Sequence, residues 1–296
     1  MKRGVVIING YPNGEKFFRQ GERIAAALSA QGIQTDVLKN GEGCVTLTQE
    51  GGVQSPIAEK YAFAVYLDKD KYLGELLEQA GVKLFNTAKA VELCDDKMKT
   101  YLALLGRNIP LIETIAAPLC YTPNATPNVV FLENVAKQLG FPLVAKKSYG
   151  SFGAGVRLIH GMPELIKTEQ EWLYEAHFFQ RYEASSFGRD IRMIVIGGKV
   201  FACMERIAQA GEFRSNVELG GIGREITPER AYIDVAERAA SVLGLDYCGV
   251  DVLETDRGPV ICEVNSNAFF EGIEAVTGKD IANEYARHII KMMTEK

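Results

Sequence analysis

The C-terminal third of the chain contains two long stretches of strand-forming residues, each interrupted by a short turn. The first stretch covers 189–206 and turns at Gly197-Gly198, and the second covers 247–265 and turns near 256–258. Glycine and aspartate at the centre of such stretches are typical of β-hairpins. With a helix expected at about 228–243 between them, these hairpins predict an antiparallel α+β unit.

The first ninety residues have a different rhythm, in which short apolar runs alternate with polar, helix-compatible segments. This alternation is typical of βαβ units around a parallel sheet. The expected strands and helices are, in order, 5–8, 21–31, 61–68 and 71–80.

The middle of the chain begins with a segment, 92–106, that has long or apolar side chains at every fourth position and is closed by Asn108 and Pro110. This spacing predicts one amphipathic helix. A linker rich in proline, threonine and asparagine is expected at about 118–128, and a further strand at 176–182. We therefore expect an α/β and α+β protein with units at 1–93, 94–178 and 179–296.

Composition excludes several classes of function. The 296 residues carry a net charge of −5, which argues against a broad nucleic-acid surface, and their apolar runs are too short to span a bilayer. The six cysteines lack metal-site spacing, and the three histidines are far apart. We expect a cytoplasmic globular protein that acts on small molecules or proteins, without a zinc site, a disulfide framework or a membrane anchor.

The second hairpin carries a candidate metal site. Glu263 and Asn265 are two residues apart, so the pleat of a strand points both side chains to one face. Asp251 on the partner strand joins them if the connecting loop has an odd number of residues, such as 255–259. Two carboxylates and an amide oxygen suit Mg²⁺ bound together with nucleotide phosphates. The alternative is the ordinary solvated face of an edge strand.

A glycine-rich segment, SYGSFGAG at 148–155, lies between expected strands at 143–147 and 156–160. It lacks both the P-loop pattern and the glycine fingerprint that opens a dinucleotide-binding helix. Backbone N–H groups of such a hairpin can still cover phosphates, and Lys146 just before it can supply a positive charge. A plain surface hairpin remains the alternative.

Charged residues gather around the first hairpin, partly inside strands that are otherwise apolar. Arginines that converge on a phosphate site would stabilise the charge of an acyl phosphate and its transition state. Structural ion pairing is the alternative. The candidate catalytic residues are Arg192, Arg206 and Arg214.

From about residue 95 to the C-terminus, the sequence resembles the RimK-type branch of the ATP-grasp superfamily, whose members join a carboxylate to an amine. The resemblance is carried by GRDIRMIVIGGKVFACMER (188–206), GEFRSNVELGG (211–221), GVDVLETDRGPVICEVN (249–265) and EGIEAVTGKDIA (271–282). It implies the ATP-grasp fold, in which two α+β subdomains enclose ATP after an N-terminal βαβ unit.

The resemblance also implies roles for individual residues. Lys97 and Lys146 would contact phosphates, and Asp251, Glu263 and Asn265 would bind two Mg²⁺ or Mn²⁺ ions. Arg214 would also clamp the acyl phosphate. The residues implied to contact the rest of ATP are the hinge strand Gln180, Arg181 and Tyr182, together with Asp190, Arg214, Ser215 and Asn216.

Two positions depart from the family pattern. The hinge commonly has glutamate where this chain has Arg181, and the family's Asn-Ala-Ser-Pro-Gly turn is here the segment 265–269, followed by another phenylalanine. Asn267 and the Phe269-Phe270 pair should reshape the acceptor side of the site, unless both rings belong to the core.

The implied reaction joins glutamate or a similar acidic amino acid to a peptide, protein or small amine, with release of ADP and phosphate. A macrocyclase of the graspetide type and a non-catalytic ATP-binding protein are the other hypotheses. Relatives commonly form homo-oligomers, and the substrates are not defined by the sequence.

Overall fold

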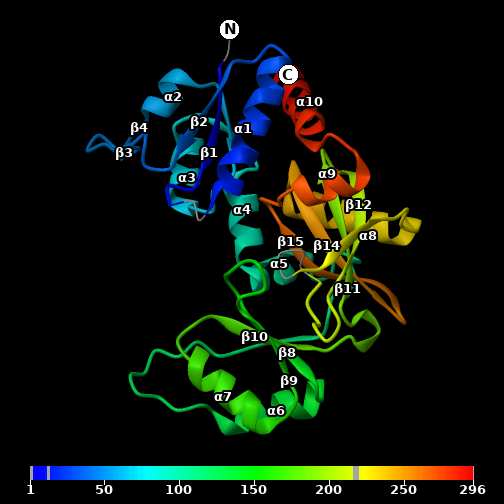
Figure 1. Ribbon diagram of the computed structural model, residues 1–296. Helices are drawn as coiled ribbons and strands as arrows, with labels where there is room; N and C mark the ends of the chain where they lie inside the picture. The colour runs from blue at the N-terminus through cyan, green and yellow to red at the C-terminus, as the bar shows by residue number, and fades with distance from the viewer. Residues whose placement is uncertain (1–2, 12–13, 216–219, 296) are drawn as a thin grey trace.

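The computed structural model describes residues 3–11, 14–215 and 220–295. Figure 1 shows an upper part, which contains both chain termini, and a lower lobe at the opposite end of the molecule. Within the described residues, no helix combines the length and apolar character that a membrane span requires.

The N-terminal sheet is parallel, with the strand order β2-β1-β5-β6. All residues of β1 and β5 are buried, as expected for central strands covered on both faces. This confirms the predicted βαβ unit, to which the structure adds β2, β6 and a small hairpin. Its elements are β1 (Gly4–Ile8), α1 (Glu15–Ala30), β2 (Thr35–Lys39), β3 (Thr46–Leu47), β4 (Val53–Gln54), α2 (Pro56–Lys60), β5 (Phe63–Tyr66), α3 (Lys71–Gln79) and β6 (Lys83–Phe85).

The segment predicted as one helix over 92–106 is instead divided between α4 (Ala88–Asp95) and α5 (Lys97–Leu104), so that prediction was wrong. The break is at Asp96, whose backbone is extended. Its side chain accepts hydrogen bonds from the N–H groups of Met98 and Lys99 at 2.9 and 3.2 Å. An N-cap of this kind satisfies the free N–H groups that begin a new helix. The break places Lys97 at the start of α5.

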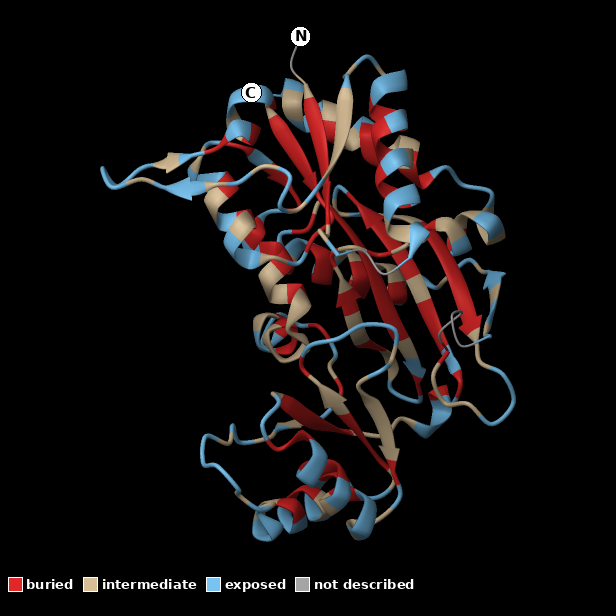
Figure 2. Ribbon diagram, turned by 60° about the vertical axis from the view of Figure 1, so that its left-hand side comes forward, coloured by how far each residue is buried: buried red, intermediate tan, exposed pale blue. Residues whose placement is uncertain are grey.

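The lower lobe is built on an antiparallel sheet with the order β7-β10-β8-β9. Figure 2 shows buried residues of its helices facing this sheet, where Leu132, Leu165, Trp172 and Phe179 share a core. The predicted strands at 143–147, 156–160 and 176–182 are confirmed within a residue at each end. The elements are β7 (Thr114–Ala116), α6 (Val129–Leu139), β8 (Leu143–Lys147), β9 (Val156–Ile159), α7 (Met162–Trp172) and β10 (His177–Arg181).

The C-terminal sheet is antiparallel, with the order β13-β12-β11-β14-β15, and contains both predicted hairpins. Gly197 and Gly198 form the first turn with φ angles of 55° and 75°, which residues other than glycine rarely adopt. The elements are η1 (Ala184–Ser186), β11 (Arg189–Ile196), β12 (Lys199–Ile207), β13 (Ile222–Glu225), α8 (Arg230–Leu243), β14 (Tyr247–Thr255), β15 (Gly258–Asn265), α9 (Glu271–Thr277) and α10 (Ile281–Thr294).

The N-terminal and C-terminal sheets share one apolar core, to which α1 and α10 also contribute. Buried Asn86 strengthens this junction. Its amide nitrogen donates to the carbonyl oxygens of Tyr247 and Ser266 at 2.8 and 2.9 Å, and its oxygen accepts from the N–H groups of Asp246 and Tyr247 at 2.7 and 3.0 Å. A single side chain thus fixes the start of β14 and the end of β15 relative to the N-terminal unit.

We predict that Asn86→Ala lowers the free energy of unfolding by about 3 kcal/mol, because the substitution leaves buried backbone groups without partners. Chemical denaturation followed by circular dichroism measures this change. Asn134→Ala, at an exposed position of α6, is the control and should change stability by less than about 0.5 kcal/mol. Equal effects of the two substitutions would contradict the role given to Asn86.

Candidate active site

The principal cleft lies between the lower lobe and the C-terminal sheet and encloses about 1010 Å³, including the space at its open mouth. Among the described residues that line it, seven are lysine or arginine and four are aspartate or glutamate. The cleft is therefore positively charged although the whole chain is negatively charged. Such a surface suits a polyanionic ligand such as a nucleoside triphosphate.

The hairpin of β14 and β15 brings Asp251 directly opposite Glu263, as the sequence predicted, but by a different route. The turn is short, because Thr255 pairs with Gly258, and a loop of this length alone would place Asp251 opposite Cys262. A β-bulge between Asp251 and Val252 restores the register. The proposed odd-numbered loop was therefore wrong, and the bulge supplies the extra residue on β15.

Asp251 is the centre of a buried ion-pair network. Arg192 binds it in a bidentate manner, with Nε–Oδ1 and Nη2–Oδ2 distances of 2.7 and 2.6 Å. Arg206 also contacts Asp251, at 2.9 Å from Nη2 to Oδ2, and binds both carboxylate oxygens of Asp190. Burial alone would raise the pKa of Asp251, but the two guanidinium groups outweigh it and hold the pKa at about 2.

The sequence left two interpretations for Arg192 and Arg206: stabilisation of a phosphate or structural ion pairing. The network shows that both form ion pairs. Both guanidinium groups are engaged by carboxylates, as in structural ion pairing. Arg206 nevertheless lines the principal cleft together with Asp190 and Asp251, whereas Arg192 lines a neighbouring cleft. Both arginines thus bring positive charge to the site, but the carboxylates that they bind balance part of it.

Lys97, at the start of α5, and Lys146, on β8, both line the cleft. Lys97 Nζ donates to the carbonyl oxygen of Gly150 at 2.6 Å and lies 3.3 Å from Glu263 Oε1. Lys97 therefore ties the glycine-rich segment 148–155 to β15. Lys146 Nζ lies 3.7 Å from the sulfur of Cys262 and also lines the cleft. The structure brings together both lysines, as the sequence predicted.

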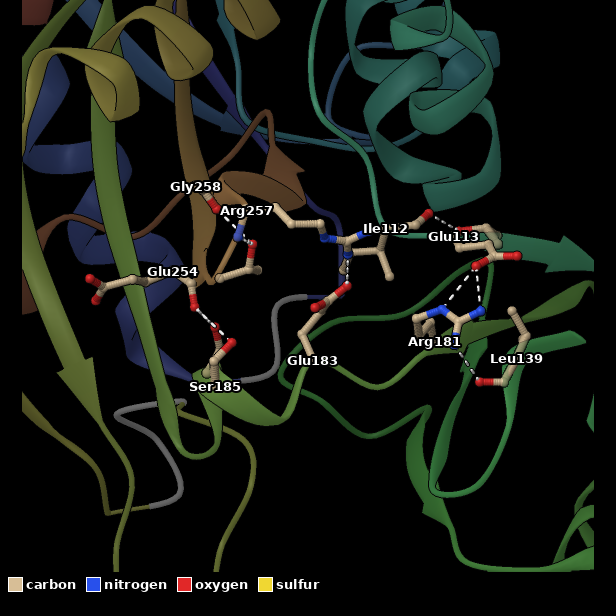
Figure 3. A network of polar contacts seen from close by, with 12 residues as sticks. Ile112, Glu113, Leu139, Arg181, Glu183, Ser185, Glu254, Arg257 and Gly258 are labelled. Carbon is tan, nitrogen blue, oxygen red and sulfur yellow. Dashed lines mark hydrogen bonds and ion pairs between the residues drawn. The ribbon is translucent and has the colours of Figure 1, made fainter.

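The hinge residues Gln180, Arg181 and Tyr182 line the cleft at the end of β10. Figure 3 shows the guanidinium of Arg181 directed toward Glu113, to which it donates at 2.9 and 2.6 Å, and toward the carbonyl oxygen of Leu139. Its side chain is thus occupied by structural contacts. A backbone role for this strand in base recognition is compatible with that arrangement.

Figure 3 also shows how the segment after the hinge meets the hairpin of β14 and β15. Glu183, after the hinge, accepts a hydrogen bond from Arg257 Nη2 at 2.7 Å. Ser185 donates to the carbonyl oxygen of Glu254 at 3.4 Å. The turn between β14 and β15 is therefore held against the segment that connects the lower lobe to the C-terminal sheet.

Arg214 and Ser215 also line the principal cleft. Arg214 pairs with Glu212 at 2.8 Å, and its Nη1 donates to the carbonyl oxygen of Gly153 at 3.1 Å. This contact links Arg214 to the glycine-rich segment across the cleft. The predicted site residue Asn216 lies outside the described residues.

A second cleft adjoins the first and shares Ser151, Phe152 and Glu263 with it. Asn265 lines this cleft rather than the principal one. Sequence reasoning did not identify Phe17, Lys69 and Phe152 as site residues, and only Phe152 carried a signal, since it lies within the glycine-rich segment. The other two are brought there by tertiary packing of the N-terminal unit.

The phenylalanine pair after β15 divides between two roles. Phe269 lines the second cleft, whereas Phe270 is 1% exposed and belongs to the core. Core packing, the alternative given for the pair, is therefore correct for Phe270. Phe269 borders the second cleft instead.

Asp251, Glu263 and Asn265 carry oxygen donors of the kind that a divalent ion accepts, but only Asp251 and Glu263 line the principal cleft. Asp251 already makes three contacts to arginine, and a carboxylate has about four lone-pair positions. Among the described residues, no group of three or more histidine, cysteine, aspartate and glutamate side chains forms a metal cage. The donor set therefore suits Mg²⁺, which usually takes one or two protein carboxylates and completes its shell with phosphate and water.

We predict that Arg206→Leu destabilises the protein by about 3–5 kcal/mol, because it leaves two buried carboxylates without their shared cation. Urea denaturation measures the change. Arg224→Leu is the matched control, since Arg224 pairs with Glu205 but its side chain is 67% exposed. That substitution should cost about 1 kcal/mol or less. A loss for Arg206→Leu no larger than for the control would contradict the network.

Known proteins resemble this chain over most of its length. Residues 94–289 match the model of the RimK-like ATP-grasp domain. A probable α-L-glutamate ligase from Pseudomonas entomophila (strain L48) is 37% identical over 218 residues, which cover 72% of this chain and 69% of that protein. β-Citrylglutamate synthase B from Danio rerio is 30% identical over 234 residues, which cover 78% of this chain but only 56% of the relative.

Solved structures show a similar fold at low sequence identity. D-alanine–D-alanine ligase from Bacillus anthracis complexed with ATP has a TM-score of 0.73 at 19% identity, covering 99% of this chain and 100% of that one. A RimK domain protein from Sphaerobacter thermophilus DSM 20745 has a TM-score of 0.71 at 20% identity, covering 96% and 98%. The ATP-grasp ligase PsnB, complexed with minimal precursor, Mg and ADP, has a TM-score of 0.70 at 17% identity, covering 99% and 98%.

Proposed function

Because the chain belongs to the RimK-like ATP-grasp family, we propose that it is an ATP- and Mg²⁺-dependent ligase that joins a carboxylate to an amine. The carboxylate substrate is glutamate or a similar acidic amino acid, and the acceptor is the amine of a peptide, protein or small molecule. The names of two relatives, an α-L-glutamate ligase and a β-citrylglutamate synthase, support this substrate class.

The observation that carries the proposal is the position of Glu263 at the junction of the two clefts. The principal cleft has the size and charge for ATP, and we assign the phosphate end of ATP to the region of Glu263, Lys97 and the segment 148–155. The second cleft opens at the same point. A carboxylate bound at this junction, beside Glu263, would lie next to the terminal phosphate, as phosphoryl transfer requires.

In the proposed reaction, a carboxylate oxygen of the acidic substrate attacks the terminal phosphorus of ATP, and ADP leaves. The amine then attacks the carbonyl carbon of the acyl phosphate, loses a proton and displaces inorganic phosphate. The product contains a new C–N bond. The residues of the chain act mainly by positioning the reactants and balancing their charge, because neither step requires a covalent enzyme intermediate.

We assign the nucleotide contacts accordingly. Lys97 and Lys146 hold phosphates, the backbone of the hinge strand 180–182 binds adenine, and Arg214 holds the acyl phosphate from the side of Gly153. Two Mg²⁺ ions, held by Asp251, Glu263 and Asn265, would supply further positive charge to the phosphate oxygens when bound. In this assignment ATP lies between units 94–178 and 179–296.

We give Arg192 and Arg206 a supporting role in catalysis. Their contacts with Asp251 fix the orientation of its carboxylate beside Glu263. Arg206 also keeps Asp190 in place at the edge of the principal cleft. Both residues would thus act on the reaction through the acidic side chains that they bind.

The test is release of ADP in the presence of Mg²⁺, measured over pairs of acidic amino acids and amines. Glu263→Gln should reduce the rate by about 100-fold or more, because it removes the negative charge that is proposed to bind Mg²⁺ and that pairs with Lys97. Glu254→Gln, at an exposed position of the same hairpin, is the control and should leave the rate unchanged. Failure of every pair to stimulate ADP release, despite ATP binding, would contradict the ligase proposal and favour a non-catalytic ATP-binding protein.

A further inference from the structure

The second cleft lies where open α/β sheets usually bind ligands. Lys69 lines it and comes shortly after β5, at the carboxyl end of the parallel N-terminal sheet. The side-chain amide of Asn267 donates to the carbonyl oxygen of Leu67 at the same edge. In the order β2-β1-β5-β6, the chain passes from β1 to β2 on one side, and the later strands β5 and β6 lie on the other side of β1. The crevice at such a switch point, here between β1 and β5, is a common binding position.

One side of this cleft is an aromatic wall, formed by Phe17, Phe152 and Phe269. The rings of Phe17 and Phe269 are perpendicular at 4.9 Å between centroids, and those of Phe152 and Phe269 are stacked at 6.2 Å. The rings come from α1, from the glycine-rich segment and from the loop after β15. Lys16 Nζ lies 3.8 Å from the centroid of Phe152 and 4.8 Å from that of Phe269.

The wall differs from an ordinary core cluster because its rings border open space. Phe270 is fully packed in the core, but Phe152 is 38% exposed and has a φ angle of 59°. A bulky residue rarely adopts that backbone conformation, and such strain is found most often at functional sites. Apolar surface left in a cleft gains free energy when a ligand covers it, at about 25 cal/mol per Å².

The remaining lining of the cleft is polar. It contains Lys69, Arg192 and Asn267, and it ends at Glu263 where the two clefts meet. Lys69 is paired with Asp95 at 2.8 Å, and Arg192 is paired with Asp251. A ligand that places its reacting group near Glu263 and fills the cleft will therefore meet polar groups at one end and aromatic rings along its side.

From this arrangement we propose that the second cleft binds the amine acceptor, and that the acceptor carries an apolar or aromatic group beside its amine, which packs on the aromatic wall. This inference rests on the proposed ligase function and narrows its acceptor class. Phe152 belongs to both clefts, so an acceptor that covers the wall also holds the segment 148–155 over the phosphates. The acceptor should then promote ADP release through Phe152.

The experiment compares glycinamide with phenylalaninamide, two amines that differ only in the side chain, in the ADP-release assay with glutamate and Mg²⁺. We expect kcat/KM for phenylalaninamide to exceed that for glycinamide by about tenfold or more, as burial of an aromatic group allows. Phe269→Ala and Phe152→Ala should reduce this ratio to below about threefold, mainly through the KM of the acceptor. Phe269→Leu, which keeps an apolar side chain, should retain part of the preference.

Phe18→Ala is the matched control, because Phe18 is the neighbour of Phe17 on α1 but is exposed and lines neither cleft. It should leave the ratio and the KM for ATP unchanged, and circular dichroism shows whether each variant is folded. Equal kinetics with the two amines, or a change in the KM for glutamate instead of the acceptor, would overturn the inference and leave the ligase function intact. Absence of ADP release with every pair would overturn both.

Discussion

The buried network of Asp190, Arg192, Arg206 and Asp251 is the interaction on which the arrangement of the site depends. Isolated charges in a protein interior are costly, so each of these side chains requires the others. The network connects neighbouring strands of the C-terminal sheet, since Asp190 and Arg192 lie on β11, Arg206 on β12 and Asp251 on β14. It therefore fixes the position of Asp251 opposite Glu263.

Glu263 connects this network to the glycine-rich segment 148–155 through Lys97. Lys97 pairs with Glu263 and also donates to the backbone of Gly150, while Arg214 donates to the backbone of Gly153. The segment that would cover phosphates is thus held by cations that themselves belong to the cleft. A bound nucleotide would compete for these cations, which gives the segment a physical means to respond to the ligand.

The two clefts share Ser151, Phe152 and Glu263, but different units of the chain form the rest of their lining. The principal cleft is formed by the lower lobe and the C-terminal sheet, whose motifs carry the family resemblance. The second cleft also uses Phe17 and Lys69 from the N-terminal unit, which lies before the residues that match the family model. The principal cleft is thus built by the part of the chain that matches the family model, and the second cleft needs the N-terminal unit as well.

The sequence by itself determined the elements whose cause is local. Stretches of strand-forming residues with turn residues at their centres predicted both C-terminal hairpins, and the pleat placed Glu263 and Asn265 on one face. A single helix over 92–106 was predicted wrongly because the capping strength of Asp96 outweighed a continuous spacing of side chains. Tertiary structure alone decided the bulge beside Asp251, the pairing of Arg192 and Arg206 with carboxylates, and the meeting of Phe17, Phe152 and Phe269. These depend on contacts between residues far apart in the chain, whose energies no local pattern encodes.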